Sequence, residues 1–444
     1  MIRTSTPNPN YPARCLPPEP TGGVAPAPGD TVLVYGRLLC GDARGGLLLG
    51  PDGVKFQCRW AWVGQPPAGG AILEVEGRAE KGGVWATRVR VLAPALARPR
   101  VGEWGEWEEE QARMRRVLAL RAQVFAAVRA HFAAAGFLEV ETPGMVPAPG
   151  QEANLLLFET RYRARQPVDL CLVSSPEHHM KRLLGAGFAR IYQLGRAFRN
   201  GERSATHLPE FTMLEWYRAY ASYEEIMVDV EALVAGVSLA VRGTTVFEYQ
   251  GQALDLTPPW RRLSVREAFA EFAGIDLDPE VSLNVFRRLA TKCSASVDTK
   301  DSWEEIFFKL LLEKIEPGMA ATGRPVLLRD YPASMAALAK IRPGDGVAER
   351  VEAYAGGMEL ANGFTELNDP EEQRRRFAAE RAKRAALGFP LHPIDEEFLE
   401  MLRLGMPPAG GMALGMDRLV MLLADARCID EVVAFPFPVV EALV

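Results

Sequence analysis

Histidine and paired cysteine are scarce in this chain. Its 444 residues include 5 histidines and 6 cysteines, and no two cysteines form a C-x-x-C pair. This spacing argues against a structural zinc site and against a disulfide framework. No apolar run reaches the roughly 18 residues that a membrane helix needs, and prolines stand where a signal peptide would carry its apolar segment. We therefore expect a cytoplasmic protein without membrane spans.

Hydrophobic residues make up 48% of the chain, which suits two or three globular domains. The formal net charge of −6 is unevenly distributed, since residues 1–100 hold 12 Lys and Arg against 7 Asp and Glu. A small basic domain of this kind can contact nucleic acid or an acidic protein, although ordinary surface variation explains the bias nearly as well.

The first hundred residues divide into two parts. Residues 1–28 are rich in proline and small residues, so we expect a flexible tail. Residues 29–100 contain five short β-type runs separated by Gly, Pro and Asp, which predicts a small barrel of the oligonucleotide-binding (OB) type. Such barrels can bind single strands, but the fold alone does not establish this. The candidate surface groups are Arg37, Lys55, Phe56, Arg59 and Trp60.

Residues 101–444 are expected to form the second domain. Apolar residues recur at the helical period from Met114 to Phe132, and Gly136 is suited to end that helix. The following segment FLEVETP alternates briefly and stops at Pro143, as an edge strand does. A long helix followed by a short strand forms either plain core or a dimer interface.

The stretch from Arg190 to Tyr217 predicts a β-hairpin with a charged loop. The loop contains four charged groups, Arg196, Arg199, Glu202 and Arg203, together with His207. Guanidinium groups suit phosphate oxygens, so the hairpin is interpreted as a phosphate clamp.

The turn Ser-Ser-Pro-Glu at 174–177 follows an apolar strand and begins a helix. Glu177 in the first turn complements the helix dipole, and this structural role is as strong an interpretation as a carboxylate waiting for an amine. His178 and His179 lack a third ligand for a metal and are interpreted as surface residues.

Carboxylates are concentrated again between residues 349 and 369. If VEAYAGGMEL turns at Gly356-Gly357, Glu352 and Glu359 face the same way on neighbouring strands. Two such carboxylates repel each other unless a hard cation such as Mg²⁺ neutralises them, the alternative being a solvated sheet face. Near the C-terminus, GGMALGMDR predicts a glycine-rich strand that runs into a helix, with Arg418 at an anion-binding junction.

Three separate pieces together resemble the signature motifs of class II aminoacyl-tRNA synthetases: the helix and strand ending at Pro143, the hairpin FRNGE…HLPEFTMLEWY, and GMALGMDR. The segment ELANGFTELND is similar to the lysine branch of that family. The resemblance covers about residues 112–438. It implies an α+β catalytic domain with an antiparallel sheet flanked by helices, a homodimer, and activation of lysine by ATP and Mg²⁺ to a lysyl-adenylate.

The resemblance also implies roles for individual residues. Arg199 would hold the α-phosphate and Arg418 the γ-phosphate side, as the two catalytic arginines. The remaining ATP-binding residues are Glu202, His207, Phe211, Glu352 and Glu359, the last two also holding the metal. Glu202 stands one position later in its loop than in the relatives, which separates it from their adenine contact. The lysine-binding residues are Ser175, Glu177, Glu215, Tyr217, Asn362, Glu366, Ala413 and Gly415.

Two small residues narrow the resemblance to one group of related enzymes. Ser175 replaces an alanine of ordinary lysyl-tRNA synthetases and Ala413 replaces a glycine, and both changes look like the elongation factor P lysine ligases. That family implies transfer of lysine, preferably (R)-β-lysine, to a lysine side chain of elongation factor P. The alternative is a compact lysyl-tRNA synthetase with tRNA as its partner. A non-catalytic sensor is disfavoured, because binding alone does not need a full phosphate and metal set.

Overall fold

The structure of the protein is a computed structural model that describes residues 28–50, 54–62, 65–81, 83–95, 103–278, 281–293 and 296–437, with side chains from residue 112 in the first helix. The chain divides into two compact units, Met1–Arg116 and Val117–Val444. The predicted flexible tail lies outside the described residues, except for residue 28. The described cysteines, Cys40, Cys58, Cys171, Cys293 and Cys428, are free thiols, as their spacing predicts.

The first unit contains a closed barrel with the strand order β1-β2-β3-β5-β4. Its strands are β1 (Thr31–Asp42), β2 (Gly45–Leu49), β3 (Lys55–Arg59), β4 (Ile72–Glu80) and β5 (Gly83–Ala93). Closure follows because β1 pairs with both β2 and β4. Buried residues at alternate positions, such as Leu73 and Val75, fill the interior, as the period of two requires. The prediction of a five-stranded OB-like barrel is confirmed.

The prediction that Trp60 lies on the surface of this barrel is wrong. Trp60 is buried in the barrel core, and its indole Nε1 donates a hydrogen bond to the Asp42 carbonyl. Phe56 also packs against that core, whereas Trp85 on β5 is half exposed. The reason is that a small barrel lacks apolar volume and uses its large aromatic side chains to fill it.

The second unit is built on an eight-stranded sheet with the order β14-β15-β16-β17-β18-β11-β10-β6. Most neighbours are antiparallel, and the pairs β14–β15 and β10–β6 at the two ends are parallel. The strands are β6 (Leu138–Glu139), β10 (Arg190–Phe198), β11 (Glu210–Ala219), β14 (Arg261–Ser264), β15 (Val326–Pro332), β16 (Val347–Ala355), β17 (Met358–Thr365) and β18 (Ala409–Gly415).

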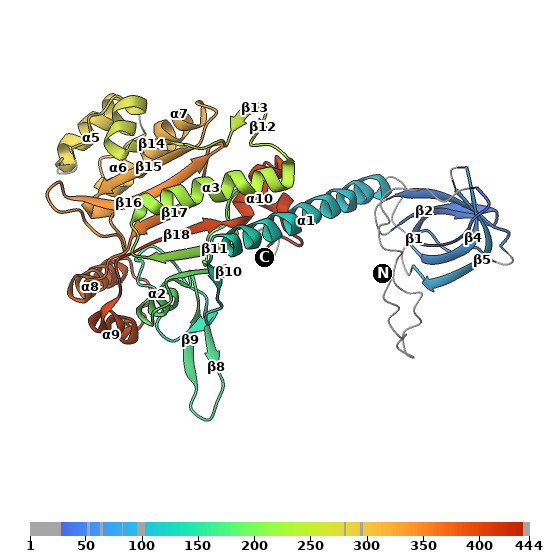
Figure 1. Cartoon of the computed structure of the whole chain (residues 1–444), viewed down its shortest axis with the longest axis horizontal. Coiled ribbons are helices and arrows are strands. Elements are labelled where there is room, and N and C mark those ends of the chain that lie inside the picture. The colour runs from blue at the N-terminus through green and yellow to red at the C-terminus, as the bar shows by residue number, and fades with distance from the viewer. Residues whose placement is uncertain are drawn as a thin grey trace. The chain divides into compact units, whose positions relative to one another are not determined.

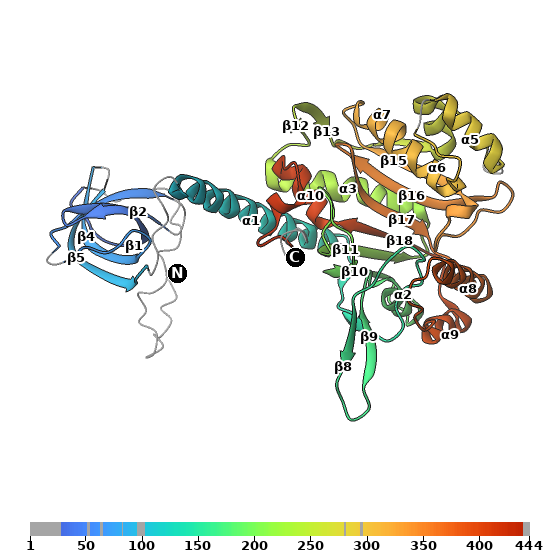
Figure 2. The ribbon, with the colours of Figure 1, turned by 180° about the vertical axis from the view of Figure 1, so that it is seen from behind.

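Helices cover both faces of this sheet (Figures 1 and 2). Three of them, α1 (Glu103–Ala134), α3 (Tyr223–Arg242) and α10 (Met416–Ala424), pack on one face through a large apolar core. On the other face, α2 (Glu177–Gly185), α8 (Pro370–Ala386) and α9 (Glu396–Gly405) form a second core with β10 and β11. The short helices α4 (Val265–Ala268), α5 (Leu283–Lys292), α6 (Trp303–Leu310) and α7 (Glu316–Ala320) pack on β14 to β16.

Two small sheets complete the unit. One has the order β7-β9-β8, from Met145–Val146, Val168–Leu172 and Glu159–Tyr162, and the other pairs β12 (Val246–Tyr249) with β13 (Gln252–Asp255). The segment Ala112–Ala134 of α1 is long and apolar enough to cross a membrane by length and composition. However, Val124, Val128 and Phe132 of that segment lie in the core of this unit, so the helix has a packing partner in the fold.

Both predicted hairpins form. β10 pairs with β11 over their whole lengths, and β16 pairs with β17 across a turn at Gly356 and Gly357. Both glycines have positive φ, +58° and +76°, which explains their place in the turn. The prediction that His178 lies on the surface is wrong. It is buried, stacked on Phe398 with ring centroids 4.5 Å apart, because α2 and α9 need a large side chain between them.

Candidate active site

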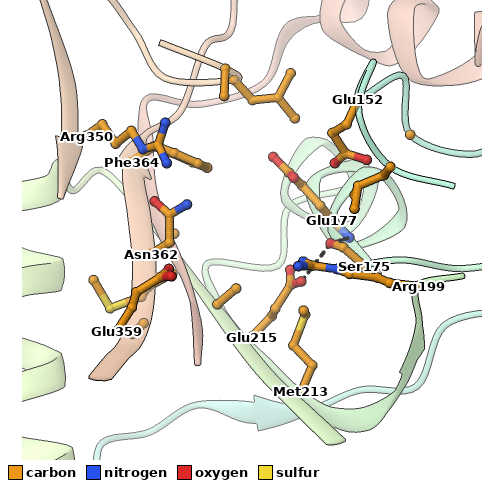
Figure 3. Close-up of a pocket in the computed structure, with 18 of the residues that line it drawn as sticks. Glu152, Ser175, Glu177, Arg199, Met213, Glu215, Arg350, Glu359, Asn362 and Phe364 are labelled. Atoms are coloured by element: carbon orange, nitrogen blue, oxygen red, sulfur yellow. Dashed lines mark hydrogen bonds between the residues drawn. The ribbon is translucent and has the colours of Figure 1, made fainter. Parts of the chain in front are cut away.

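A cavity of about 800 Å³ lies over the face of the sheet where β11, β17 and β18 are adjacent. Figure 3 shows Glu152 and Glu177 on one wall, with Arg350, Asn362 and Phe364 on the opposite wall. The cavity brings together residues of the hairpin motif and of the GMALGMDR motif, which lie far apart in the sequence, and the first motif contributes none of the described lining residues. Its lining includes the predicted residues Ser175, Glu177, Arg199, Glu202, His207, Phe211, Glu215, Tyr217, Glu359, Asn362, Glu366, Ala413, Gly415 and Arg418.

Glu215 on β11 dominates one end of this cavity. The side chain is buried, with Oε1 accepting from the Ser175 hydroxyl at 2.6 Å and Oε2 accepting from the Tyr217 hydroxyl at 2.8 Å. Burial and the neighbouring Glu177 raise the pKa of Glu215 to about 8. Within the described residues Glu215 forms no ion pair, so a cationic group of a ligand would complete its environment.

Lys181 on α2 changes the expected roles of two other carboxylates. Its ammonium is fully buried and lies 2.5 Å from Glu177 Oε1 and 2.5 Å from Glu366 Oε2. Although burial opposes its charge, the two carboxylates raise the pKa of Lys181 above its ordinary value. Glu177 and Glu366 therefore already share an internal cation, which leaves Glu215 as the unpaired one of the three.

The floor of the cavity is a row of residues across three strands. Asn362 on β17, Ala413 on β18 and Glu215 on β11 are register partners in this order. The methyl group of Ala413 thus lies between an amide and a carboxylate that both face the cavity. Beside this row, a Cβ added at Gly411 would stand 2.3 Å from the Tyr217 ring and 2.4 Å from Glu366 Oε1, so only glycine allows their approach.

The opposite end of the cavity is basic, and Arg418 at the start of α10 is held firmly there. Its guanidinium donates to the Glu359 carbonyl at 2.7 Å and to the Thr206 carbonyl at 3.3 Å, and Nη2 lies 2.6 Å from His207 Nε2. Burial, with Arg418 and Arg199 nearby, lowers the pKa of His207 to about 4. A neutral imidazole can accept from Arg418 through Nε2 while its Nδ1 proton reaches the Ser204 hydroxyl, 2.8 Å away.

Arg199 follows β10 and stacks over an aromatic ring. Its guanidinium carbon lies 5.3 Å from the centre of the Phe211 ring, and Nη1 lies 3.9 Å from Glu202 Oε2. Its Nε is buried and has no hydrogen-bond partner in the described part of the chain. Arg199 is therefore positioned by stacking and keeps donors for an anion, as a phosphate clamp requires.

The two predicted metal ligands occupy different environments. Glu352 stands behind the cavity wall, with Oε1 accepting from Arg350 at 2.6 Å and Oε2 from the hydroxyls of Tyr331 and Tyr354, at 2.5 Å and 2.7 Å. Glu359 lines the cavity next to Arg418. Among the described residues, no three His, Cys, Asp or Glu side chains are grouped as a metal would need.

Repulsion between carboxylates nevertheless marks this place as suited to a cation. Burial and the charges of Glu359 and Glu352 raise the pKa of Glu316 on α7 to about 7, and burial with the charge of Glu352 raises the pKa of Glu359. Carboxylate oxygens are the ligands that Mg²⁺ prefers. The donor chemistry therefore fits a hard cation that shares these residues with a phosphate ligand.

Residues 108–438 match the family model described as tRNA synthetases class II (D, K and N). The chain belongs to this family. Its expected catalytic fold, a helix-flanked sheet preceded by a barrel, is thereby confirmed, with the correction that the sheet has two parallel pairs at its ends.

Curated relatives of this class II synthetase chain carry the name lysine--tRNA ligase. One from Moorella thermoacetica is 43% identical over 324 residues, which cover 73% of this chain and 65% of the relative. One from Chloroflexus aurantiacus is 40% identical over 323 residues, 72% of this chain and 65% of the relative. One from Dehalococcoides mccartyi is 41% identical over 366 residues, which cover 79% of this chain and 72% of the relative. The matches to the first two therefore span less than two thirds of those relatives' own length.

Several residues of this candidate site were not predicted from the sequence. Asp417, next to Arg418, is buried and accepts from the Thr212 amide at 2.7 Å and from Arg121 at 2.5 Å, which fixes β11 against α10. Lys181, Gly411 and Glu152 also stand at the cavity or beneath it. A signal existed only for Lys181, a lysine that lies next to the apolar buried position Met180 in the same helix.

Proposed function

We propose that the protein activates lysine with ATP to form lysyl-adenylate and pyrophosphate, and then transfers the lysyl group to tRNA. The observation that carries the proposal is Glu215, a buried carboxylate bonded only to hydroxyls within the described chain, in a cavity that Arg199 and Arg418 also line. A buried carboxylate favours a cationic ligand. Lysine offers Glu215 an ammonium group, and the triphosphate of ATP offers the two arginines an anion.

The roles of the residues follow from their positions. Phe211 and Arg199 form a stack on which an adenine ring and the α-phosphate can lie, and Arg418 with His207 faces the outer phosphates. The attacking carboxylate of lysine needs no enzyme base, since it is already ionised. Arginines that are fixed before the ligand binds stabilise the charge that develops on phosphorus at little reorganisation cost.

Mg²⁺ would be held by Glu359, with Glu352 and Glu316 adjacent to it. Glu352 accepts one hydrogen bond at Oε1 and two at Oε2, so Oε1 is the oxygen with a lone pair left for the ion. When bound, the ion would neutralise charge on the pyrophosphate leaving group. The expected homodimer rests on the family and the expected cytoplasmic location on the sequence. Both remain proposals, and analytical ultracentrifugation tests the first.

A second acceptor, elongation factor P, is favoured by one specific observation. Ser175 donates directly to Glu215, and the Ala413 methyl lies beside it in the cavity floor, at the two positions whose residues resemble the elongation factor P lysine ligases. The names of the relatives favour tRNA, so tRNA now precedes elongation factor P. In this second function, (R)-β-lysine would replace lysine as the preferred substrate.

One experiment separates the two acceptors. The purified protein is incubated with ATP, Mg²⁺, labelled lysine or labelled (R)-β-lysine, and either total tRNA or purified elongation factor P. Label on tRNA supports the first function, and label on elongation factor P supports the second. Pyrophosphate release with lysine but label on neither acceptor would retain the activation step and reject both acceptors.

A further inference from the structure

Glu152 is a carboxylate of the cavity wall to which the proposed lysine contacts assign no role. It lies between β7 and β8 in a segment that the rest of the fold holds in place. The buried Arg384 donates to the Glu152 carbonyl at 3.1 Å, and Glu380 accepts from the Ala153 amide at 3.1 Å. The buried Gln151 side chain donates to the carbonyls of Pro149 and Pro393. The backbone is therefore fixed, so the direction of the Glu152 side chain is a property of the fold.

The carboxylate of Glu152 points into the cavity (Figure 3) and is incompletely paired. Its Oε2 is shielded from solvent and has no hydrogen-bond partner among the residues described. It lies over Gly150, where an added Cβ would stand 3.1 Å from Oε2 and 3.4 Å from Oε1. Burial raises the pKa of Glu152, and Arg199 opposes that shift. Burying such a group without a partner is costly, which points to a ligand that supplies one.

The charged neighbours of Glu152 include the proposed phosphate ligand Arg199. Arg199, Glu177 and His178 are the groups whose charges act on it. Arg199 is the proposed α-phosphate ligand, so a group bound between it and Glu152 is close to the carboxylate under activation. Glu177 is already paired with Lys181. Lysine brings two ammonium groups, and the lining offers two carboxylates that no ion pair of the described chain satisfies, Glu215 and Glu152.

We propose that Glu152 is a specificity-determining residue that binds the amino group beside the reacting carboxylate, while Glu215 binds the distant ammonium. This inference rests on the proposed activation of lysine and deepens it. It makes the site a reader of both amino groups, so a substrate that lacks the amino group near its carboxylate leaves Glu152 unpaired and binds poorly. Such selection by an unpaired buried group is stronger than selection by shape alone.

The test compares lysine with 6-aminohexanoate, which keeps the distant ammonium and the carboxylate and lacks the other amino group. Calorimetry measures the Kd of both for the full chain and for Glu152→Gln. We expect the Kd of lysine to rise about ten- to hundredfold, as for loss of a charge-assisted hydrogen bond, and that of 6-aminohexanoate to stay within about twofold. The methyl group of Gly150→Ala displaces the Glu152 carboxylate. This variant should therefore weaken lysine binding by less than Glu152→Gln does, and should leave 6-aminohexanoate binding unchanged. Glu397→Gln, at an exposed carboxylate on α9, is the matched control.

Equal weakening of both ligands by Glu152→Gln and Gly150→Ala, or no change for either, overturns the inference. If Glu152→Gln does not fold, Gly150→Ala decides by itself. Failure of the proposed function has a different signature, namely no lysine-dependent pyrophosphate exchange by the unaltered protein. Calorimetric binding needs no catalysis, so the ratio of the two Kd values still tests Glu152 in that case.

Discussion

The two ends of the cavity carry opposite charge but share one construction. At the acidic end, Glu366 is fixed by Lys181, and Glu215 receives only hydroxyl hydrogen bonds within the described residues. At the basic end, Arg418 is fixed by His207 and two carbonyls, and the Arg199 Nε lacks a partner among the described groups. At each end, the protein itself holds one charged group in place and leaves another for a ligand. Charged groups in this site are therefore positioned before a substrate binds.

The largest effect is expected at the internal ammonium of the acidic end. Lys181→Met removes the cation shared by Glu177 and Glu366 and leaves Glu366 buried without a partner. Breaking a buried ion pair in this way costs about 3–5 kcal/mol. Thermal and urea unfolding should both show this loss. The double variant Lys181→Met/Glu366→Gln should recover part of it, and equal stability of the single variant and the unaltered protein would contradict the assignment.

Glu215→Gln tests the group left for the ligand at the same end. The variant keeps the shape and loses the charge that pairs with the substrate ammonium, so kcat/KM for lysine in pyrophosphate exchange should fall about 100-fold or more. The unfolding free energy should change far less than in the Lys181 variant. A loss of stability without loss of activity would show that Glu215 is structural.

The pH dependence of lysine binding follows from the same carboxyl. With a pKa of about 8 in the free protein, Glu215 is mostly protonated at pH 7, so lysine affinity should rise about tenfold between pH 7 and pH 9. Because the folded pKa lies above the unfolded one, Glu215 lowers the unfolding free energy as pH rises from about 4.5 to 8. Calorimetry between pH 7 and pH 9 measures the change in lysine affinity, and an affinity that is flat over this range would argue for an ionised Glu215.

His207→Ala breaks the fixed group of the basic end. Arg418 keeps two carbonyl contacts and loses its imidazole acceptor, so the KM for ATP should rise about five- to tenfold, as for the net loss of one ordinary hydrogen bond. The KM for lysine should stay nearly constant, since His207 lies at the other end. A parallel rise in both values would mean that the two ends are not independent.

The smallest effect is expected at the cavity floor. Ala413→Gly removes one methyl group between Asn362 and Glu215, and a pocket change of this size is worth about 1 kcal/mol, the lower end of the range for one methylene group. The ratio of kcat/KM for lysine to that for (R)-β-lysine should move toward lysine. An unchanged ratio would remove Ala413 from the determinants of substrate choice.

The sequence by itself determined the local elements. The alternation of apolar residues predicts the five barrel strands, and Gly356-Gly357 predicts the turn between Glu352 and Glu359, because both are short-range patterns with a fixed period. The motifs likewise identified residues at both ends of the cavity. Their spacing could not say which charges are already paired.

Only the tertiary structure decided that pairing. Lys181 and Glu366 are 185 positions apart and meet because α2 packs beside the end of β17, and Arg121 reaches Asp417 from a different helix. The same holds for Trp60, whose burial depends on barrel closure. Electrostatic energy depends on distance and burial, and neither is encoded in residue order. The resemblance already implied Glu215 as a lysine-binding residue, but only the folded chain shows that Glu215 and Glu152 lack an ion-pair partner among the described residues.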